Sequence, residues 1–278
     1  MRCRICFKFA VISTALWIAG CVHSANDRSA VDSHETLENG TIQVLSSGGF
    51  TAAYRILGPQ FEVETGYTLE TEYGASSGGA PDSIPERLLR GEHTDIVILS
   101  VTGLGNLTEA GFVDPSSHVD LARSRIGMAV RAGADIPDID DVDAFVQVLR
   151  DAVSIGYSAS ASGTYLSTVL FPQMRIWDEI QSKSERIVSE RVAAVVARGD
   201  VEIGFQQISE ILPIDGVSYV GPIPDELQKV TTFSAGITVN ADNVEGARAL
   251  IDYLSSTDKI EQIEATGLAP VAAELADK

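Results

Sequence analysis

The sequence predicts an α/β protein of two lobes, each a mostly parallel sheet flanked by helices, with two crossing strands as the hinge. From Thr41 onward, short apolar runs alternate with segments of helical period. Parallel neighbours need a crossover, which is normally a helix, so this alternation favours parallel sheets. Apolar strands near 125–130 and 232–239 flank a middle block that repeats the alternation, which indicates two crossings between lobes.

The chain begins with a segment typical of a secretory leader. Arg2, Arg4 and Lys8 precede an uncharged apolar run over residues 9–20. That run is about a dozen residues, shorter than the roughly 20 that a membrane-spanning helix needs. We therefore expect residues 1–21 to direct export.

The leader ends in Ile18-Ala19-Gly20-Cys21, which resembles the lipobox of bacterial lipoproteins. The resemblance implies lipidation of Cys21 and an anchor on the periplasmic or outer face of a bacterial membrane, with no other membrane contact. The alternative is an ordinary cleavage site beside an unmodified cysteine. Membrane extraction of a Cys21→Ala variant separates the two.

Composition excludes several classes of function. Cys3 and Cys6 lie in the leader, so the mature chain has no disulfide and no thiolate cluster. The formal charge of −19 becomes about −22 without the leader, which argues against nucleic acid as a partner. The four histidines lack paired ligand spacing, and no Gly-x-Ser-x-Gly or phosphate-loop motif occurs. We expect neither a metal nor a cofactor.

The predicted domain organisation has four parts. A polar tether follows the leader at 22–40. Lobe 1 is predicted to comprise 41–125 plus 235–278, and lobe 2 to comprise 126–234. The expected strands lie at 42–45, 68–73, 95–99, 153–157 and 201–205, and the expected helices at 50–66, 84–90, 103–111, 142–152, 163–174, 188–197, 244–254 and 260–265.

Hydroxyl-rich loops follow four predicted strands. Ligands of open parallel sheets bind beyond the carboxyl ends of the strands, where these loops lie. Serine hydroxyls and the amides of helix N-termini can hold an anion without lysine, although each loop alone also suits a cap or turn. Because four loops share the trait, we expect a binding site for a small anion at Ser46, Ser47, Ser76, Ser77, Ser100, Ser160, Ser162, Gly163 and Thr164.

Several segments give the chain a family resemblance over 41–272. They are Pro59-Gln60-Phe61-Glu62, Arg87-Leu88-Leu89-Arg90-Gly91-Glu92, Val220-Gly221-Pro222-Ile223 and Thr266-Gly267-Leu268-Ala269-Pro270. With them the chain resembles the molybdate-binding branch of periplasmic solute-binding proteins. The resemblance implies a type II two-lobed fold, an oxyanion in the cleft, and an ABC-type transporter as partner of a monomeric binding protein.

The chain departs from that branch after Phe205. Gln206 and Gln207 stand where the branch tends to place a tyrosine, and the loop from Ala75 is longer. Both differences would suit a larger, carboxylate-bearing ligand, so we add the two glutamines to the expected site. Segments 45–50, 84–88 and 204–210 resemble a subgroup that includes aconitate isomerase.

Three hypotheses for function follow from these patterns. The first is an anion-binding protein serving uptake; the second is an isomerase that shifts the double bond of a tricarboxylic acid; the third is an anchored interaction protein without a ligand. An isomerase needs a base, for which Tyr157, Tyr165 and Glu210 are candidates, although the tyrosines equally suit packing and Glu210 a solvated helix. Arg87, Arg90 and Arg125 are the cations that could clamp carboxylates.

Overall fold

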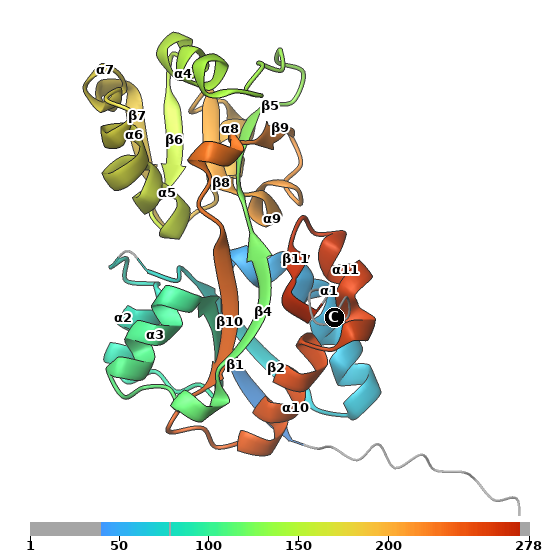
Figure 1. The fold of residues 1–278 in the computed structure, drawn as a ribbon. Helices are drawn as coiled ribbons and strands as arrows, with labels where there is room; N and C mark the ends of the chain where they lie inside the picture. The colour runs from blue at the N-terminus through green and yellow to red at the C-terminus, as the bar shows by residue number, and fades with distance from the viewer. Residues whose placement is uncertain (1–39, 78, 273–278) are drawn as a thin grey trace, which may run out of the picture. The chain divides into compact units, whose positions relative to one another are not determined.

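The structure contains two β-sheets. Strands from the N-terminal and the C-terminal parts of the described chain form the first. A computed structural model describes residues 40–77 and 79–272, so Cys21 and most of the predicted tether lie outside the described residues. The strand order is β11-β4-β10-β3-β1-β2. Figure 1 shows β4 and β10 side by side. The strands are β1 Thr41–Ser47, β2 Thr68–Gly74, β3 Ile96–Ser100, β4 Val119–Ser124, β10 Thr231–Ile237 and β11 Ala269–Pro270.

The second sheet comes from the middle of the chain, in the order β7-β6-β8-β5-β9. Its strands are β5 Ile126–Arg131, β6 Ile155–Ser158, β7 Ser184–Ile187, β8 Ile203–Gln207 and β9 Val217–Pro222. Arg125 alone separates β4 of the first sheet from β5 of the second, and the chain returns through β10. We call the first sheet with its helices lobe 1 and the second lobe 2.

The predicted two-lobed α/β class is confirmed, but the sheets are mixed rather than mostly parallel. β1 pairs in parallel with β2 and β3, and β6 pairs in parallel with β7 and β8. β10 is antiparallel to β3 and β4, and β5 is antiparallel to β8 and β9. The reason lies in the hinge: β4 leads directly into the other lobe and β10 returns beside it, so the two strands run in opposite directions.

Helices follow most of the strands, as the periodicity predicts. They are α1 Gly48–Thr65, α2 Ile84–Leu89, α3 Val101–Glu109, α4 Val142–Asp151, α5 Ala161–Tyr165, α6 Phe171–Gln173, α7 Trp177–Ile180, α8 Val192–Arg198, α9 Ile208–Ile211, α10 Val244–Leu254 and α11 Ile260–Glu264. A π-helical stretch, η2 Leu166–Leu170, joins α5 to α6, and short 3-10 turns are η1 Pro115–Ser117, η3 Gln181–Lys183, η4 Asp225–Leu227 and η5 Thr257–Lys259.

Several expected boundaries are displaced by about two residues or more, and two of these differences bear on the site. The helix expected at 188–197 begins only at Val192, because Ser189 has a φ of 60° in the left-handed region, which breaks helical continuity. The first strand does not end at residue 45 in a loop; β1 continues through Ser47, and α1 starts at once with Gly48.

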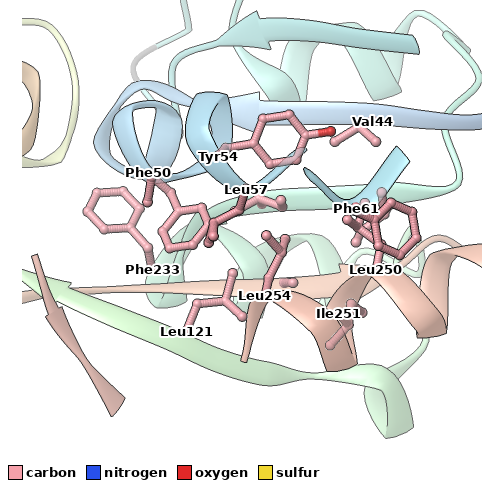
Figure 2. Packing of buried hydrophobic residues seen from close by; sticks show 14 of the residues in the cluster. Val44, Phe50, Tyr54, Leu57, Phe61, Leu121, Phe233, Leu250, Ile251 and Leu254 are labelled. Atoms are coloured by element: carbon pink, nitrogen blue, oxygen red, sulfur yellow. The ribbon is translucent and has the colours of Figure 1, made fainter. Parts of the chain in front are cut away.

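Each lobe has its own apolar core. In lobe 1, Phe50, Leu57 and Phe61 of α1 pack against Leu254 of α10 and Phe233 of β10 (Figure 2). In lobe 2 the rings of Phe145 and Phe171 pack edge-on against Phe205, and all three are fully buried. Burying one such side chain contributes about 1.5–3 kcal/mol, so these clusters hold the strand ends that carry the site. Within the described ranges, no helix is long and apolar enough to cross a membrane.

Candidate functional site

A cavity of about 420 Å³ opens where the ends of β1, β6 and β8 meet the segments that follow β2 and β7. Both lobes line it. Lobe 1 contributes Gly48 and Arg55, and lobe 2 contributes Ser160, Arg191 and Glu210. Its position beyond the strand ends agrees with the general rule for α/β sheets.

Two of the predicted site residues line this cavity directly, Ser160 and Gln206. Gln206 lies in β8 rather than in a loop, and its Oε1 accepts a hydrogen bond from Ala193 N at 3.3 Å. Gln207 is next along the strand, so its side chain points to the opposite face of the sheet, where Nε2 donates to Thr231 Oγ1 at 3.1 Å. The two glutamine side chains therefore have different hydrogen-bond partners on opposite faces of the sheet.

Ser46 and Ser47, the first pair of predicted hydroxyl residues, do not line the cavity. Ser46 and Ser47 are buried in the last positions of β1, and the Ser47 hydroxyl has no hydrogen-bond partner among the described residues. The following glycine lines the cavity instead. A Cβ on Gly48 would lie 1.9 Å from Glu210 Oε1, so the missing side chain leaves room for a carboxyl group at the first turn of α1.

The other predicted hydroxyls mostly hold loops together. Ser76 Oγ accepts from Ser100 N at 3.1 Å, and Ser100 Oγ accepts from Gly103 N at the start of α3. Ser162 Oγ lies 3.0 Å from Ser158 Oγ. A Cβ on Gly163 would lie 1.8 Å from the Ser158 carbonyl oxygen, so glycine is required for the close approach of α5 to β6.

Ser77, Ser100 and Thr164 line a second cavity of about 260 Å³. Lys229 also lines it, with its Nζ 5.4 Å from the centre of the Tyr165 ring. The predicted hydroxyl residues are thus divided between two cavities and the packed strand ends. They do not form one cluster.

The cations of the first cavity are Arg55 and Arg191, neither of which sequence reasoning selected. Arg55 extends from α1 with its guanidinium carbon 5.2 Å from the centre of the Tyr73 ring, and Arg191 precedes α8. Neither arginine forms a salt bridge within the part of the chain that the structure describes. Their sequence contexts carry no motif, so only the fold brings them together.

Of the three candidate bases named from the sequence, Glu210 is the one that lines this cavity. A solvated helix position suited it in the sequence, but the side chain is buried on α9, with 8% of its surface exposed. Burial raises the pKa of its carboxyl group to about 7, and the positive charge of Arg191 acts in the opposite direction. Burial also lowers the pKa of Arg191 itself.

The two other carboxylates of the cavity are already engaged. Glu190 is exposed and receives two hydrogen bonds from the Arg198 guanidinium, at 3.0 and 3.3 Å. Asp82 accepts from the Ser189 hydroxyl at 2.9 Å. The cavity is therefore lined by two guanidinium groups that have no salt bridge among the described residues and by one buried carboxyl group.

The three arginines selected from the sequence lie elsewhere, in surface ion pairs. Arg87 pairs with Glu72 and Glu92, Arg90 pairs with Glu92, and Arg125 pairs with Asp225. None of them lines the first cavity.

The tyrosine candidates also have structural roles. Tyr157 is buried in the lobe 2 core against Trp177, and Tyr165 donates its hydroxyl to the Leu227 carbonyl. Over residues 40–77 and 79–272, no group of three or more His, Cys, Asp or Glu side chains could hold a metal ion.

Two α/β lobes with a cavity between them are the architecture of solute-binding proteins, and comparison identifies the family. Residues 42–269 match the model of the family described as bacterial extracellular solute-binding protein, and the chain belongs to that family. It is also 45% identical over 234 residues to an aconitate isomerase from Pseudomonas sp., covering 84% of this chain and 89% of that protein.

Solved structures agree on the fold. The periplasmic molybdate-binding protein of Azotobacter vinelandii superposes with a TM-score of 0.67 at 18% identity, covering 82% of this chain and 98% of that one. The sulfate-binding protein of Mycobacterium tuberculosis gives 0.66 at 19% identity, covering 86% and 91%. At these identities the likeness concerns the fold alone.

Proposed function

We propose that this protein is an extracytoplasmic isomerase that interconverts cis- and trans-aconitate. The observation that carries the proposal is the pair Arg55 and Arg191, two unpaired guanidiniums that line one cavity from opposite lobes. Guanidinium groups recognise carboxylates through paired hydrogen bonds, and aconitate carries three carboxylates. The 45% identity to an aconitate isomerase supports the same substrate class.

The cavity also suits a reaction that moves a proton. Isomerisation of this kind breaks a C–H bond beside one carboxylate and forms another at the far end of the allylic system. Positive groups near the substrate carboxylates stabilise the charge that develops when the proton leaves. Arg55 and Arg191 would hold those carboxylates, while Ser160 and Gln206 supply neutral polar groups on the lobe 2 wall.

The test is a turnover assay on the soluble body, residues 22–278. We expect purified protein to convert cis-aconitate to trans-aconitate, followed by proton NMR and by ultraviolet absorbance. A chain that binds both isomers and converts neither would refute the isomerase. A thermal-shift series with molybdate, tungstate, sulfate, phosphate and citrate defines what else the cavity accepts.

A second candidate is a binding protein without turnover that delivers a small anion to an ABC-type transporter. The fold shared with molybdate- and sulfate-binding proteins favours it. It predicts tight binding, lobe closure and unchanged ligand. The two candidates separate on one NMR sample, because only the isomerase alters the spectrum of the added acid.

We further propose that export ends with lipidation of Cys21. The residue lies outside the described range, and the motif Ile18-Ala19-Gly20-Cys21 supports the proposal. Membership of an extracellular family agrees with export and says nothing of the anchor. A lipid at Cys21 would hold the two lobes near the membrane surface through the tether.

A further inference from the structure

We propose that Glu210 is the residue that takes the allylic proton from the substrate and returns it, an assignment that rests on the proposed function. Its place in the cavity is set by the start of α9 and by two contacts with α1. α9 starts directly after β8, and Ser209 Oγ donates to the Gly49 carbonyl of the other lobe at 2.7 Å. This bond places the next residue, Glu210, against the first turn of α1 at Gly48.

The missing side chain of Gly48 leaves the space that the Glu210 carboxyl group occupies. The space that a Cβ would fill lies 1.9 Å from Glu210 Oε1 and 3.0 Å from its Cδ, so the glycine and the carboxyl group fit each other across the lobes. The N-terminal turn of a long helix carries a partial positive charge, and α1 has no acidic residue of its own in that turn. Glu210 supplies the negative group from lobe 2.

The surroundings of Glu210 suit a group that must be both base and acid. Burial raises the pKa of its carboxyl group to about 7, against the opposing positive charge of Arg191 and hydrogen bonds from the Gln206 side chain and the Gln207 backbone. At neutral pH both protonation states are then populated, which proton transfer in two directions requires. The Gln206 carbonyl oxygen is occupied by Ala193 N, which leaves its amide group to face the carboxyl.

The other titratable groups of the cavity fit this role poorly. Asp82 and Glu190 already accept hydrogen bonds from Ser189 and Arg198, so both carboxylates have partners within the protein. Tyr73 is 38% exposed and has the Arg55 guanidinium over its ring. Glu210 is the one buried carboxyl among the residues that line the cavity.

The chemical step balances without a co-reactant. The Glu210 carboxylate accepts a proton from the methylene carbon of aconitate, and the C–H electron pair forms a new double bond to the central carbon. The former double bond shifts its electron pair to the far carbon, which accepts a proton from the Glu210 carboxyl group. Substrate and product are isomers, and the carboxylate is regenerated.

The experiment compares Glu210→Gln with Glu185→Gln, a matched change at an exposed residue of β7. For Glu210→Gln we expect kcat for aconitate to fall by about 100-fold or more, with affinity for trans-aconitate changed only a few-fold. Solvent deuterium should also cease to enter the allylic positions in the NMR spectrum. Glu185→Gln should match the wild type in every respect.

Gly48→Ala provides a second variant should Glu210→Gln fold poorly. Its methyl group must displace the Glu210 carboxyl, so kcat should fall while thermal stability changes little. Turnover of Glu210→Gln above about a tenth of wild type, or a loss of affinity as large as the loss of kcat, overturns the assignment while the wild-type assay upholds the isomerase. A wild type that binds aconitate without turnover overturns both.

Discussion

The Ser189 hydroxyl of lobe 2 donates to the Asp82 carboxylate of lobe 1, with 2.9 Å between Oγ and Oδ1. Both residues line the first cavity, and Ser189 adopts a φ of 60°, which is uncommon for a residue with a side chain. The bond joins the segment after β2 to the segment that leads to Arg191. It thereby links the two lobes two residues before Arg191, a cation that lines the cavity.

Removing this bond should make the closing of the two lobes on the substrate less favourable and should leave the proton transfer unchanged. For Ser189→Ala we expect KM for aconitate to rise by about three- to ten-fold, because one hydrogen bond to a charged group is lost, while kcat at saturation changes less. Ser116→Ala, which removes a local serine to Asp114 bond of 2.8 Å, serves as the control. An unchanged KM for Ser189→Ala would show that the bond plays no part in closure.

The two unpaired arginines should dominate ligand affinity. Arg191→Met and Arg55→Met should each weaken aconitate binding by about 10- to 100-fold, the usual effect of losing a hydrogen bond to a charged group. Arg125→Met, whose side chain pairs with Asp225 outside this cavity, should bind as the wild type does. Isothermal titration calorimetry measures all three, and equal affinities across the set would remove the basis for the proposed site.

The pKa of Glu210 predicts how stability depends on pH. Its folded-state pKa of about 7 lies above the ordinary glutamate value of about 4.5, so the folded state binds more protons than the unfolded state between these limits. The contribution of this group to folding is therefore fully present below about pH 4.5 and is lost as the pH rises through about 7. Denaturant titrations of Glu210→Gln should show a smaller decline in stability from pH 5 to 8 than the wild type. Parallel curves would contradict the raised pKa.

The contact of α5 with β6 should tolerate no side chain at Gly163. A methyl group there would lie 1.8 Å from a backbone oxygen that cannot move away, so Gly163→Ala should destabilise the protein by about 1–3 kcal/mol. Gly105→Ala in α3 meets nothing within 4 Å and should stabilise it by about 0.5–1 kcal/mol. Thermal unfolding of the two variants should move in opposite directions.

If Cys21 carries the lipid, replacing this residue should move the protein out of the membrane fraction. Cells producing Cys21→Ala should release the protein from the membrane fraction, because the thioether that carries the lipid cannot form. The unchanged protein should stay with membranes and enter the detergent phase on extraction. Membrane association of both forms would reject the lipobox.

Local sequence patterns predicted most of the helices and strands, because hydrophobic periodicity and turn residues involve only a few neighbouring positions in the sequence. Alternating strands and helices predicted the two-lobed class, and α10 lies at 244–254 as expected. The sheets proved mixed because strand direction depends on how the chain crosses between lobes. The ends of β1 and β8 were also predicted as parts of the site, since glycines, serines and glutamines follow apolar strands there.

The chemistry of the cavity was decided by the tertiary structure. Arg55 and Arg191 are far apart in the sequence and follow no motif, and an arginine that lines a cavity has the same local sequence signature as one on the surface. Glu210 is buried next to Ser209, which bonds to Gly49 of the other lobe, a contact between residues 160 positions apart. Sequence alone thus indicated some of the segments that line the cavity, such as the ends of β1 and β8, whereas desolvation and charge depend on all surrounding atoms and could be read only from the tertiary structure.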